Sequence, residues 1–208
     1  MIEKIVELMA ELEDEELYEE VKKEVEAGTS NMDIIDSLQK GMEIVGERFA
    51  SKEYFIAELA FSAEIFEECS KLLPEGEEGE AKYGNFVLGT VYTDLHDIGK
   101  NIVHSVFKCN GFNVIDIGID AKPEQFIEAI KEYDPKVVGM SCLLTTSFDP
   151  MKDCINQIRE AGLDKGRLIL IGGTPIDENT CKYVNADEYV NDAQKGLVIA
   201  KNFVENAR

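Results

Sequence analysis

The first third of the chain repeats apolar residues at the three- and four-residue spacing of a helix. The opening segment places six of them along one stripe: Ile2, Ile5, Val6, Leu8, Met9 and Leu12. A second helix is predicted at 14–27. Ser30 and Asp33 form a predicted cap for a third helix through 34–49, and a fourth is predicted at 53–73. Four helices with short links predict a compact bundle.

The predicted fourth helix carries apolar residues around most of its circumference, whereas a helix at a protein surface needs only one apolar stripe. These residues are Tyr54, Phe55, Ile56, Ala57, Leu59, Ala60, Phe61, Ala63, Ile65 and Phe66. Two interpretations follow. Either the helix is central and contacts several neighbours, or its second apolar face covers a ligand.

Beyond residue 84 the pattern changes to short apolar runs that alternate with helical segments. Strands are predicted at 86–92, 112–118, 136–141, 167–172 and 187–190. Helices are predicted at 98–109, 123–133, 149–161, 177–183 and 192–206. These β-α repeats predict a doubly wound, five-stranded parallel sheet of flavodoxin-like or Rossmann-like type. The expected strand order is 2-1-3-4-5.

A segment rich in Gly, Pro and Glu separates the two patterns and predicts a solvated linker. We therefore expect a helical cap domain at 1–74, a linker at 75–84 and an α/β domain at 85–208. The fold class is an N-terminal four-helix bundle followed by a C-terminal α/β domain.

The net negative charge of the chain restricts the kinds of partner that it can bind. The 208 residues carry 42 acidic and 21 basic side chains, a net charge of −21. Residues 1–80 alone hold 24 acidic against 7 basic side chains. Such a field repels nucleic-acid phosphate, so we expect no nucleic-acid partner. The acidic helical part serves either solubility or the docking of a partner.

Neither a membrane span nor a signal peptide is predicted. No apolar run reaches the roughly 18–20 residues that a membrane-spanning helix needs, and the segment 1–16 is acidic and amphipathic. The five cysteines are scattered without a Cys-x-x-Cys pair, which indicates reduced thiols and not a disulfide framework or a zinc site. We therefore expect a cytoplasmic protein with no membrane partner.

The predicted sheet indicates where a ligand binds. In doubly wound parallel sheets, ligands bind outside the carboxyl ends of the strands, where the strand order reverses. Two predicted loops meet there, at 93–100 and 141–147. The loop after the fourth strand adds Gly172, Gly173, Thr174 and Pro175. Polar groups and glycines therefore converge on one crevice.

The chain has two histidines. His104 lies within a predicted helix and is interpreted as structural, whereas His96 lies on the first loop, two residues after Asp94. A metal-bound imidazole commonly donates its second N–H to a carboxylate, and Asp94 is placed for that role, with Ser147 as a further partner. One protein ligand cannot hold a bare metal ion, but it can complete a metal held by a macrocycle. A surface or capping role is the alternative for His96.

Three short motifs on these loops together resemble the cobalamin-binding signature of corrinoid proteins. In chain order they are Asp94-x-His96-x-x-Gly99, Ser141-x-Leu143 and Gly172-Gly173, separated by 41 and then 28 residues. The signature occurs in the B12 module of methionine synthase, in corrinoid subunits of methylamine, methanol and methoxyaromatic methyltransferase systems, and in B12-dependent mutases. The segment 41–63 resembles the helical cap of the methyl-transferring branch, although Ala57 stands where many caps have proline.

The resemblance implies cobalamin, or a related corrinoid, as the cofactor. It implies that the cofactor's own benzimidazole is displaced, that His96 becomes the lower axial ligand of the cobalt, and that Asp94 and Ser147 tune the proton on His96. The displaced nucleotide tail is expected in a slot beside the first, third and fourth strands. There Ser141 would hydrogen-bond the benzimidazole and Leu143 would line its pocket.

The resemblance also implies a set of residues that contact the cofactor. Around the ring and its tail they are His96, Asp97, Ile98, Gly99, Ser141, Leu143, Thr145, Gly172 and Gly173. Gly99 would permit close backbone approach, and the two later glycines would leave room for the tail. Phe55 and Leu59 of the cap would cover the upper face of the cofactor.

A carrier subunit is implied in place of a complete enzyme, because the sequence shows neither a donor nor an acceptor site for the methyl group. The implied partners are a barrel-type donor methyltransferase, an acceptor methyltransferase that uses tetrahydrofolate or a thiol, and a reductive activase. Methoxyaromatics, methylamines, betaines and methanol all stay open as the methyl donor.

Four other interpretations fit parts of the sequence. The string LHDIGK at 95–100 resembles a piece of HD-type phosphohydrolases, but these need more histidines and an all-helical setting. A cobalamin-dependent light sensor or regulator shares both modules but adds a DNA-binding domain. The small subunit of a B12-dependent mutase shares the α/β signature without the cap. A flavin-binding flavodoxin-like protein would leave the pair of Asp94 and His96 unexplained.

Overall fold

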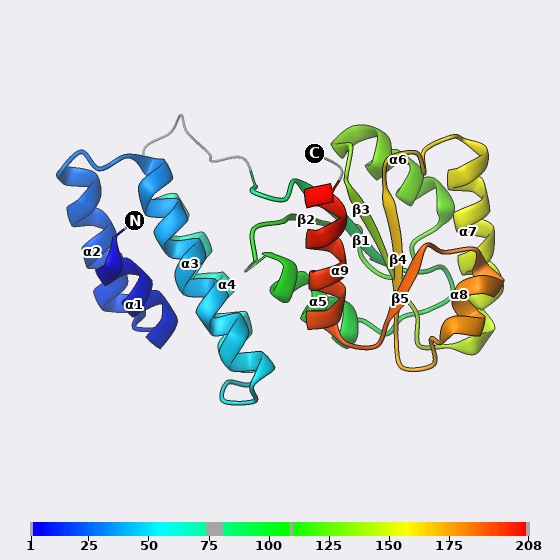
Figure 1. Ribbon diagram of the computed structural model, residues 1–208, viewed down its shortest axis with the longest axis horizontal. Coiled ribbons are helices and arrows are strands. Elements are labelled where there is room, and N and C mark those ends of the chain that lie inside the picture. The colour runs from blue at the N-terminus through cyan, green and yellow to red at the C-terminus, as the bar shows by residue number, and fades with distance from the viewer. Residues whose placement is uncertain (1, 74–80, 109, 207–208) are drawn as a thin grey trace. The chain divides into compact units, whose positions relative to one another are not determined.

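The computed structural model describes residues 2–73, 81–108 and 110–206. The chain forms two compact units, one built mainly from the helices before residue 81 and the other from the sheet that follows Lys82 (Figure 1). Most of the predicted linker, 75–80, lies outside the described residues.

Among its described residues the first unit contains four helices, which confirms the predicted bundle. They are α1 (Glu3–Glu11), α2 (Asp14–Glu26), α3 (Asn31–Ala50) and α4 (Ile56–Lys71). The predicted cap of α3 is present, because the Asp33 backbone N–H donates to Ser30 Oγ at 3.1 Å. Buried aliphatic side chains of α1, α2 and α3, such as Ile5, Leu17 and Leu38, form the core of this unit.

Helix α4 is buried along one face, which carries Leu59, Ser62, Ile65 and Cys69. Outside that face Ile56 and Phe61 are exposed, and Phe55, which precedes the helix, is 68% exposed. Because five residues separate Ile56 from Phe61, these two side chains point to different sides of the helix and do not form a second continuous face.

The second unit is a parallel sheet between helices. Its strands are β1 (Asn85–Thr90), β2 (Asn113–Asp116), β3 (Val137–Ser141), β4 (Leu168–Gly172) and β5 (Glu188–Val190). Its helices are α5 (Ile98–Lys108), α6 (Pro123–Tyr133), α7 (Phe148–Glu160), α8 (Glu178–Val184) and α9 (Ala193–Asn206). The strand order β2-β1-β3-β4-β5, with every pair parallel, confirms the predicted topology.

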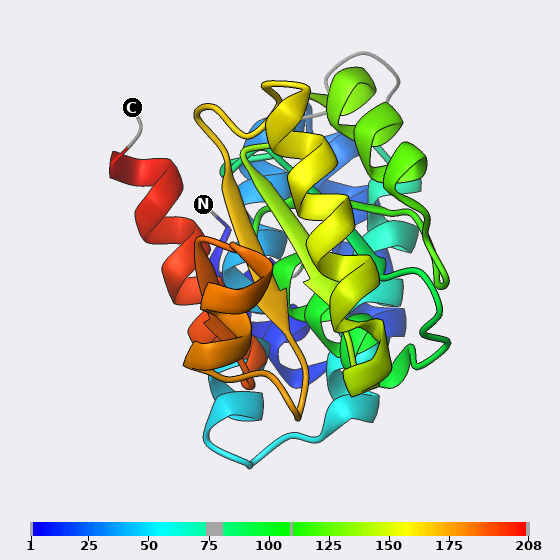
Figure 2. The ribbon, with the colours of Figure 1, turned by 90° about the vertical axis from the view of Figure 1, so that its right-hand side faces the viewer.

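The two faces of the sheet are covered by different helices (Figure 2). On one face Val87, Val138 and Ile169 belong to a buried core that they share with side chains of α6, α7 and α8. On the opposite face Phe86 stacks on Phe107 of α5 at 4.4 Å, and α9 approaches Leu170 through Gly196. The central strands β1, β3 and β4 are therefore buried on both sides, which is why they read as continuous apolar runs.

One short element was not predicted. The residues Thr145–Ser147 form a 3₁₀ turn, η1, in which the Ser147 backbone N–H donates to Leu144 O at 2.9 Å. The turn lets α7 begin at Phe148, one residue before its predicted start.

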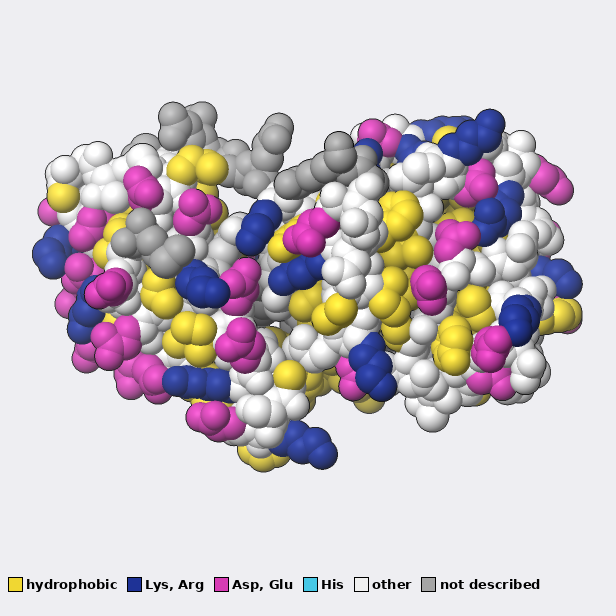
Figure 3. All heavy atoms as spheres, in the orientation of Figure 1, with side chains coloured by type: hydrophobic (Ala, Val, Ile, Leu, Met, Phe, Trp, Pro, Cys, Tyr) yellow, Lys and Arg dark blue, Asp and Glu magenta, His cyan; other side chains and the backbone are white. Residues whose placement is uncertain are grey.

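The surface carries the acidic surplus that the sequence predicts. On the face shown in Figure 3, Asp and Glu side chains gather over the helical unit. Within the described ranges, none of the helices has both the length and the apolar character that crossing a membrane requires.

Candidate functional site

The candidate site is built from the loops that follow β1 and β3. These strands are neighbours, and Thr90 lies opposite Ser141 in the register, so both loops leave the sheet at the same edge. Thr93 adopts a left-handed conformation with φ of 71°, and its backbone N–H donates to Asp120 Oδ1 at 2.7 Å. The turn at Thr93 comes directly before Asp94.

Asp94 is buried and accepts four N–H hydrogen bonds. Its Oδ1 accepts from the backbone N–H and from ring Nδ1 of His96, at 3.0 and 2.7 Å. Its Oδ2 accepts from the backbone N–H groups of Leu143 and Leu144, at 2.6 and 3.0 Å. Burial raises the pKa of Asp94, but the donors from His96, Leu144 and Leu143 outweigh it and lower that pKa to about 2.

The same contacts fix the tautomer of His96. Because Asp94 is an ionised acceptor, Nδ1 of His96 carries the proton that is shared at 2.7 Å. The His96 carbonyl also accepts from Thr90 Oγ1 at 3.1 Å, which fixes the backbone. The side chain is 52% exposed. Nε2 is therefore the nitrogen that can act as a metal ligand.

The Ser147 hydroxyl is buried and lies 2.8 Å from Oγ1 of Thr93, the residue that precedes Asp94 in the chain. A direct hydrogen bond from Ser147 to Asp94 stays a prediction for the cofactor-bound protein.

Exposed apolar side chains stand on the loops at this edge of the sheet. They are Leu95, Ile98, Ile119, Leu143 and Leu144, of which Ile98 is 74% exposed. Apolar side chains that stay exposed at a loop edge are typical of a binding surface. A half-exposed imidazole among apolar side chains suits a flat, largely apolar macrocycle that holds a metal.

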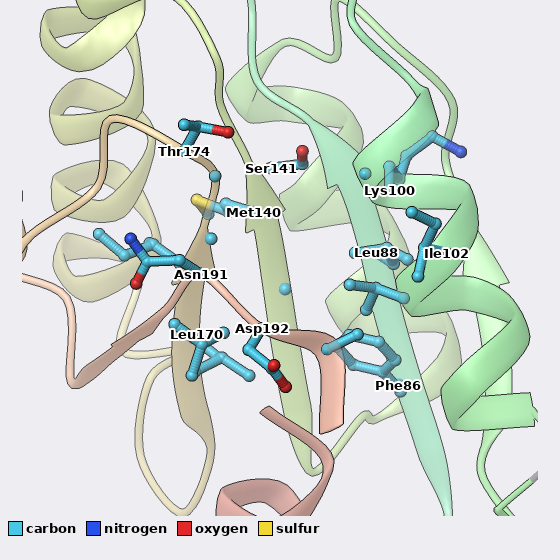
Figure 4. A pocket seen from close by; sticks show the side chains of 18 residues that line it. Phe86, Leu88, Lys100, Ile102, Met140, Ser141, Leu170, Thr174, Asn191 and Asp192 are labelled. Carbon is cyan, nitrogen blue, oxygen red and sulfur yellow. The ribbon is translucent and has the colours of Figure 1, made fainter. Parts of the chain in front are cut away.

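A cavity of about 180 Å³ opens beside these loops, between the sheet and the first turns of α5 and α9 (Figure 4). We call it the slot. Ser141, Gly172 and Gly173 line it, as does Gly99, where an added Cβ would meet nothing within 4 Å. Ser141, Gly172 and Gly173 of the predicted tail residues therefore come together in one cavity that borders β1, β3 and β4, whereas Leu143, which was also expected to line the pocket, is not among the residues that line it.

Gly173 is required by the close approach of two loops. Its φ is +146°, and a Cβ there would lie 1.9 Å from the Cys142 carbonyl oxygen. Only glycine combines this backbone conformation with this approach.

The other predicted residues, Ile98 among them, do not line the slot. Asp97 and Thr145 are exposed, at the first turn of α5 and in η1. Phe55 is exposed and Leu59 is buried, both in the helical unit. His104 lies within α5, where the sequence predicted it.

Sequence reasoning missed several residues that line the slot. They are Phe86, Leu88, Leu170, Asn191 and Asp192. Two signals could have found them. Residues 191 and 192 follow β5 and so reach the same edge as the other loops, and Phe86 and Leu88 alternate with Val87 toward the α5 side of the sheet.

The chemistry of the donor set agrees with a macrocycle-bound metal. Among the described residues, no three His, Cys, Asp or Glu side chains gather in a group that could hold a metal ion. The burial of Cys142 and its proximity to Asp94 raise the pKa of its thiol to about 12, so it stays protonated. One imidazole, an apolar rim and a slot lined by glycines together fit a corrinoid.

Known families match both units. A B12 binding domain model matches residues 84–197, and a second B12 binding domain model matches residues 1–73. A corrinoid protein of Desulfitobacterium hafniense strain Y51 is 33% identical over 92% of each chain. The trimethylamine corrinoid protein of Methanosarcina barkeri is 34% identical over 90% of this chain and 89% of its own.

Solved structures agree with these matches. A cobalamin-binding protein of Desulfitobacterium hafniense DCB-2 is 34% identical over 97% of each chain, with a TM-score of 0.73. A chain of the methanol:cobalamin methyltransferase complex of Methanosarcina barkeri is 26% identical, with a TM-score of 0.88 over 97% of this chain and 78% of its own. Fold and site thus define a B12-binding protein with two modules. The chain belongs to the corrinoid protein family, and its cofactor is a corrinoid.

Proposed function

We propose that this chain carries a methyl group within a methyltransferase system, on a cobalamin that it binds with the lower base displaced and with His96 as the lower axial ligand. Relatives named as methylamine corrinoid proteins and the structural match to a methanol:cobalamin methyltransferase complex support the carrier role. The bound corrinoid cobalt would supply the site at which the methyl group is accepted and given up.

One observation carries the ligand assignment. His96 Nδ1 lies 2.7 Å from a carboxylate that is itself fixed by backbone N–H groups, and the half-exposed ring presents Nε2 as its second nitrogen. A carboxylate behind an imidazole makes the imidazole a stronger ligand.

The surrounding residues would orient this pair and admit the tail. Leu143 and Leu144 hold Asp94 through their backbone N–H groups. The Ser147 hydroxyl would support the loop through Thr93, and Ser141 would hydrogen-bond the displaced base at the mouth of the slot. Phe55 and Leu59 stay our proposed cover for the upper face of the cofactor.

The proposed partners follow from the carrier role. A donor methyltransferase would load the methyl group, an acceptor methyltransferase would remove it to tetrahydrofolate or to a thiol, and a reductive activase would restore the cofactor. The names of the relatives point to methylamines and methanol as donor classes.

The ligand assignment is tested by substituting the two histidines separately. Purified chain mixed with hydroxocobalamin is expected to give a complex whose visible spectrum reports a displaced base and histidine ligation. His96→Ala is expected to lose the histidine-ligated spectrum, while His104→Gln is expected to keep it. Circular dichroism should show that both variants fold. An unchanged spectrum in His96→Ala would refute the assignment.

A further inference from the structure

The slot has a polar mouth and an inner end that combines apolar side chains with a carboxylate. Figure 4 shows the hydroxyl-bearing side chains of Ser141 and Thr174 toward one end of the slot, which is its mouth. Phe86 and Leu170 line the slot toward its other, inner end, and the Asp192 carboxylate lies between them in this view. A ligand that enters the slot past Ser141 would therefore turn its far edge toward Asp192.

One oxygen of the Asp192 carboxylate is engaged by the protein, and the other is available. Asp192 directly precedes α9, and its Oδ1 accepts from the Lys195 backbone N–H at 3.0 Å, as a residue that caps a helix does. Among the hydrogen bonds between described side chains and backbone groups, Oδ2 of Asp192 has no donor. Since each carboxylate oxygen can accept independently, Oδ2 can bind a donor group of a ligand in the slot.

The charge of Asp192 is not neutralised by the cation that lines the same slot. Among the described residues of the slot, Asp192 is the only acidic side chain and Lys100 the only basic one. Lys100 is buried, pairs with Asp116 and hydrogen-bonds Asn101 Oδ1 at 2.8 Å. A ligand at the inner end therefore meets a charged hydrogen-bond acceptor between two apolar side chains.

A ligand that fills the inner end displaces water from Oδ2 of Asp192. If the ligand is apolar there, the oxygen loses a hydrogen-bond partner and binding is weakened. If the ligand presents an N–H group there, a charge-assisted hydrogen bond replaces the contact with water. A site of this kind discriminates between two such ligands by about tenfold or more.

From this geometry we infer that Asp192 makes the protein prefer corrinoids whose lower base carries an amino group, as adenine does, over corrinoids with a dimethylbenzimidazole base. The inference rests on the proposed binding of the displaced base in the slot, with Ser141 at the nitrogen that the cobalt has released. The outer ring of the base would then face Asp192. It carries methyl groups in the benzimidazole and an amino group in adenine, and only the amino group can donate to Oδ2.

The preference is tested by titrating the full-length apo chain with two corrinoids, hydroxocobalamin and its adenine-containing counterpart. We expect the adenine form to bind at least about tenfold more tightly, with a histidine-ligated spectrum in both complexes. Equal or tighter binding of cobalamin would overturn the inference. Loss of the histidine-ligated spectrum with both corrinoids would instead count against the proposed function.

Two variants separate the effect of Asp192 from properties of the corrinoids themselves, such as the ease with which each base leaves the cobalt. Asp192→Asn and Asp192→Ser both keep an oxygen that can cap α9, but both remove the second carboxylate oxygen. In each variant the ratio of the affinity for the adenine form to that for cobalamin should fall by about tenfold. The affinity for cobinamide, which lacks the nucleotide tail, should stay within about twofold.

Asp177→Asn is the matched control for these variants. Asp177 caps α8 in the same way, by accepting from the Thr180 backbone N–H at 2.7 Å, and is also exposed, but it does not line the slot. The control should keep the affinity ratio of the unmodified chain.

The inference fails if the Asp192 variants keep that ratio, if Asp177→Asn lowers it as much, or if the variants lose cobinamide as strongly as the adenine form. Circular dichroism shows whether each variant folds. If neither Asp192 variant folds, the titration of the unmodified chain with the two corrinoids decides the question.

Discussion

At the residue scale, the orientation of His96 depends on the hydrogen bonds that fix the Asp94 carboxylate. Two of its hydrogen bonds come from His96 on its own loop, and two come from Leu143 and Leu144 on the neighbouring loop. A buried carboxylate with several N–H donors stays ionised, because each donor stabilises the charged form. The motif residues Asp94 and His96 were visible in the sequence, but the backbone donors were not, since any residue type supplies a backbone N–H.

The lowered pKa of Asp94 predicts a specific pH dependence of stability. Its pKa falls from 3.8 to about 2 on folding. The ionised carboxylate therefore stabilises the folded chain fully at a pH above the unfolded pKa, and this stabilisation is lost as the pH falls through the folded pKa. The contribution amounts to about 2 kcal/mol at neutral pH. Asp94→Asn should remove it.

Urea unfolding of the apo chain and of Asp94→Asn checks this prediction. The difference in unfolding free energy between the two proteins should narrow by about 1 kcal/mol between neutral pH and pH 3. The other carboxylates are common to both proteins and cancel in the comparison. A difference that stays constant or widens in acid would show that Asp94 is not held as an ionised acceptor.

At the element scale, the site depends on a contact between two loops, the one that follows β3 and the one that follows β4. The Cys142 backbone N–H donates to Gly172 O at 2.9 Å, and the Cys142 carbonyl lies against Gly173. The sequence predicted both loops at one edge, because parallel strands share the direction of their carboxyl ends. It did not predict η1, since a single 3₁₀ turn leaves no periodic pattern.

Gly173→Ala should therefore destabilise the apo chain by about 3 kcal/mol or more, because a strained φ adds to a steric overlap with backbone. Gly118→Ala is the matched control. Gly118 also has a positive φ, of 88°, but a Cβ there would meet nothing within 4 Å, so the expected cost is about 1–2 kcal/mol. Chemical denaturation measures both values. Equal costs would show that the loops do not depend on this close approach.

At the scale of the whole molecule, periodicity was enough to predict both units and the strand order. The switch from helical spacing to short apolar runs marks the border, and each family model matches one side of it. The slot was harder to predict in full. On one wall the Phe86 ring of β1 lies against Gly139 of β3, and the spacing of residues within either strand does not predict such a contact between strands.

The domain boundaries predict that the α/β unit carries the ligand site alone. A fragment of residues 82–208 should fold and bind hydroxocobalamin with the same histidine-ligated spectrum as the full chain, because His96, Asp94 and the slot residues all lie within it. Absorbance titration and circular dichroism check this. A folded fragment that binds no corrinoid would mean that the helical unit supplies an essential contact.

Electron paramagnetic resonance of the cobalt(II) complex can identify the axial nitrogen, which we propose to be that of His96. Nuclear spin of the axial nitrogen splits the cobalt signal, so a chain grown with ¹⁵N-labelled histidine reveals whether that nitrogen belongs to the protein or to the cofactor's base. We expect labelling to change the splitting in the unmodified chain and in His104→Gln, but not in His96→Ala. A splitting that labelling leaves unchanged in the unmodified chain would contradict the account.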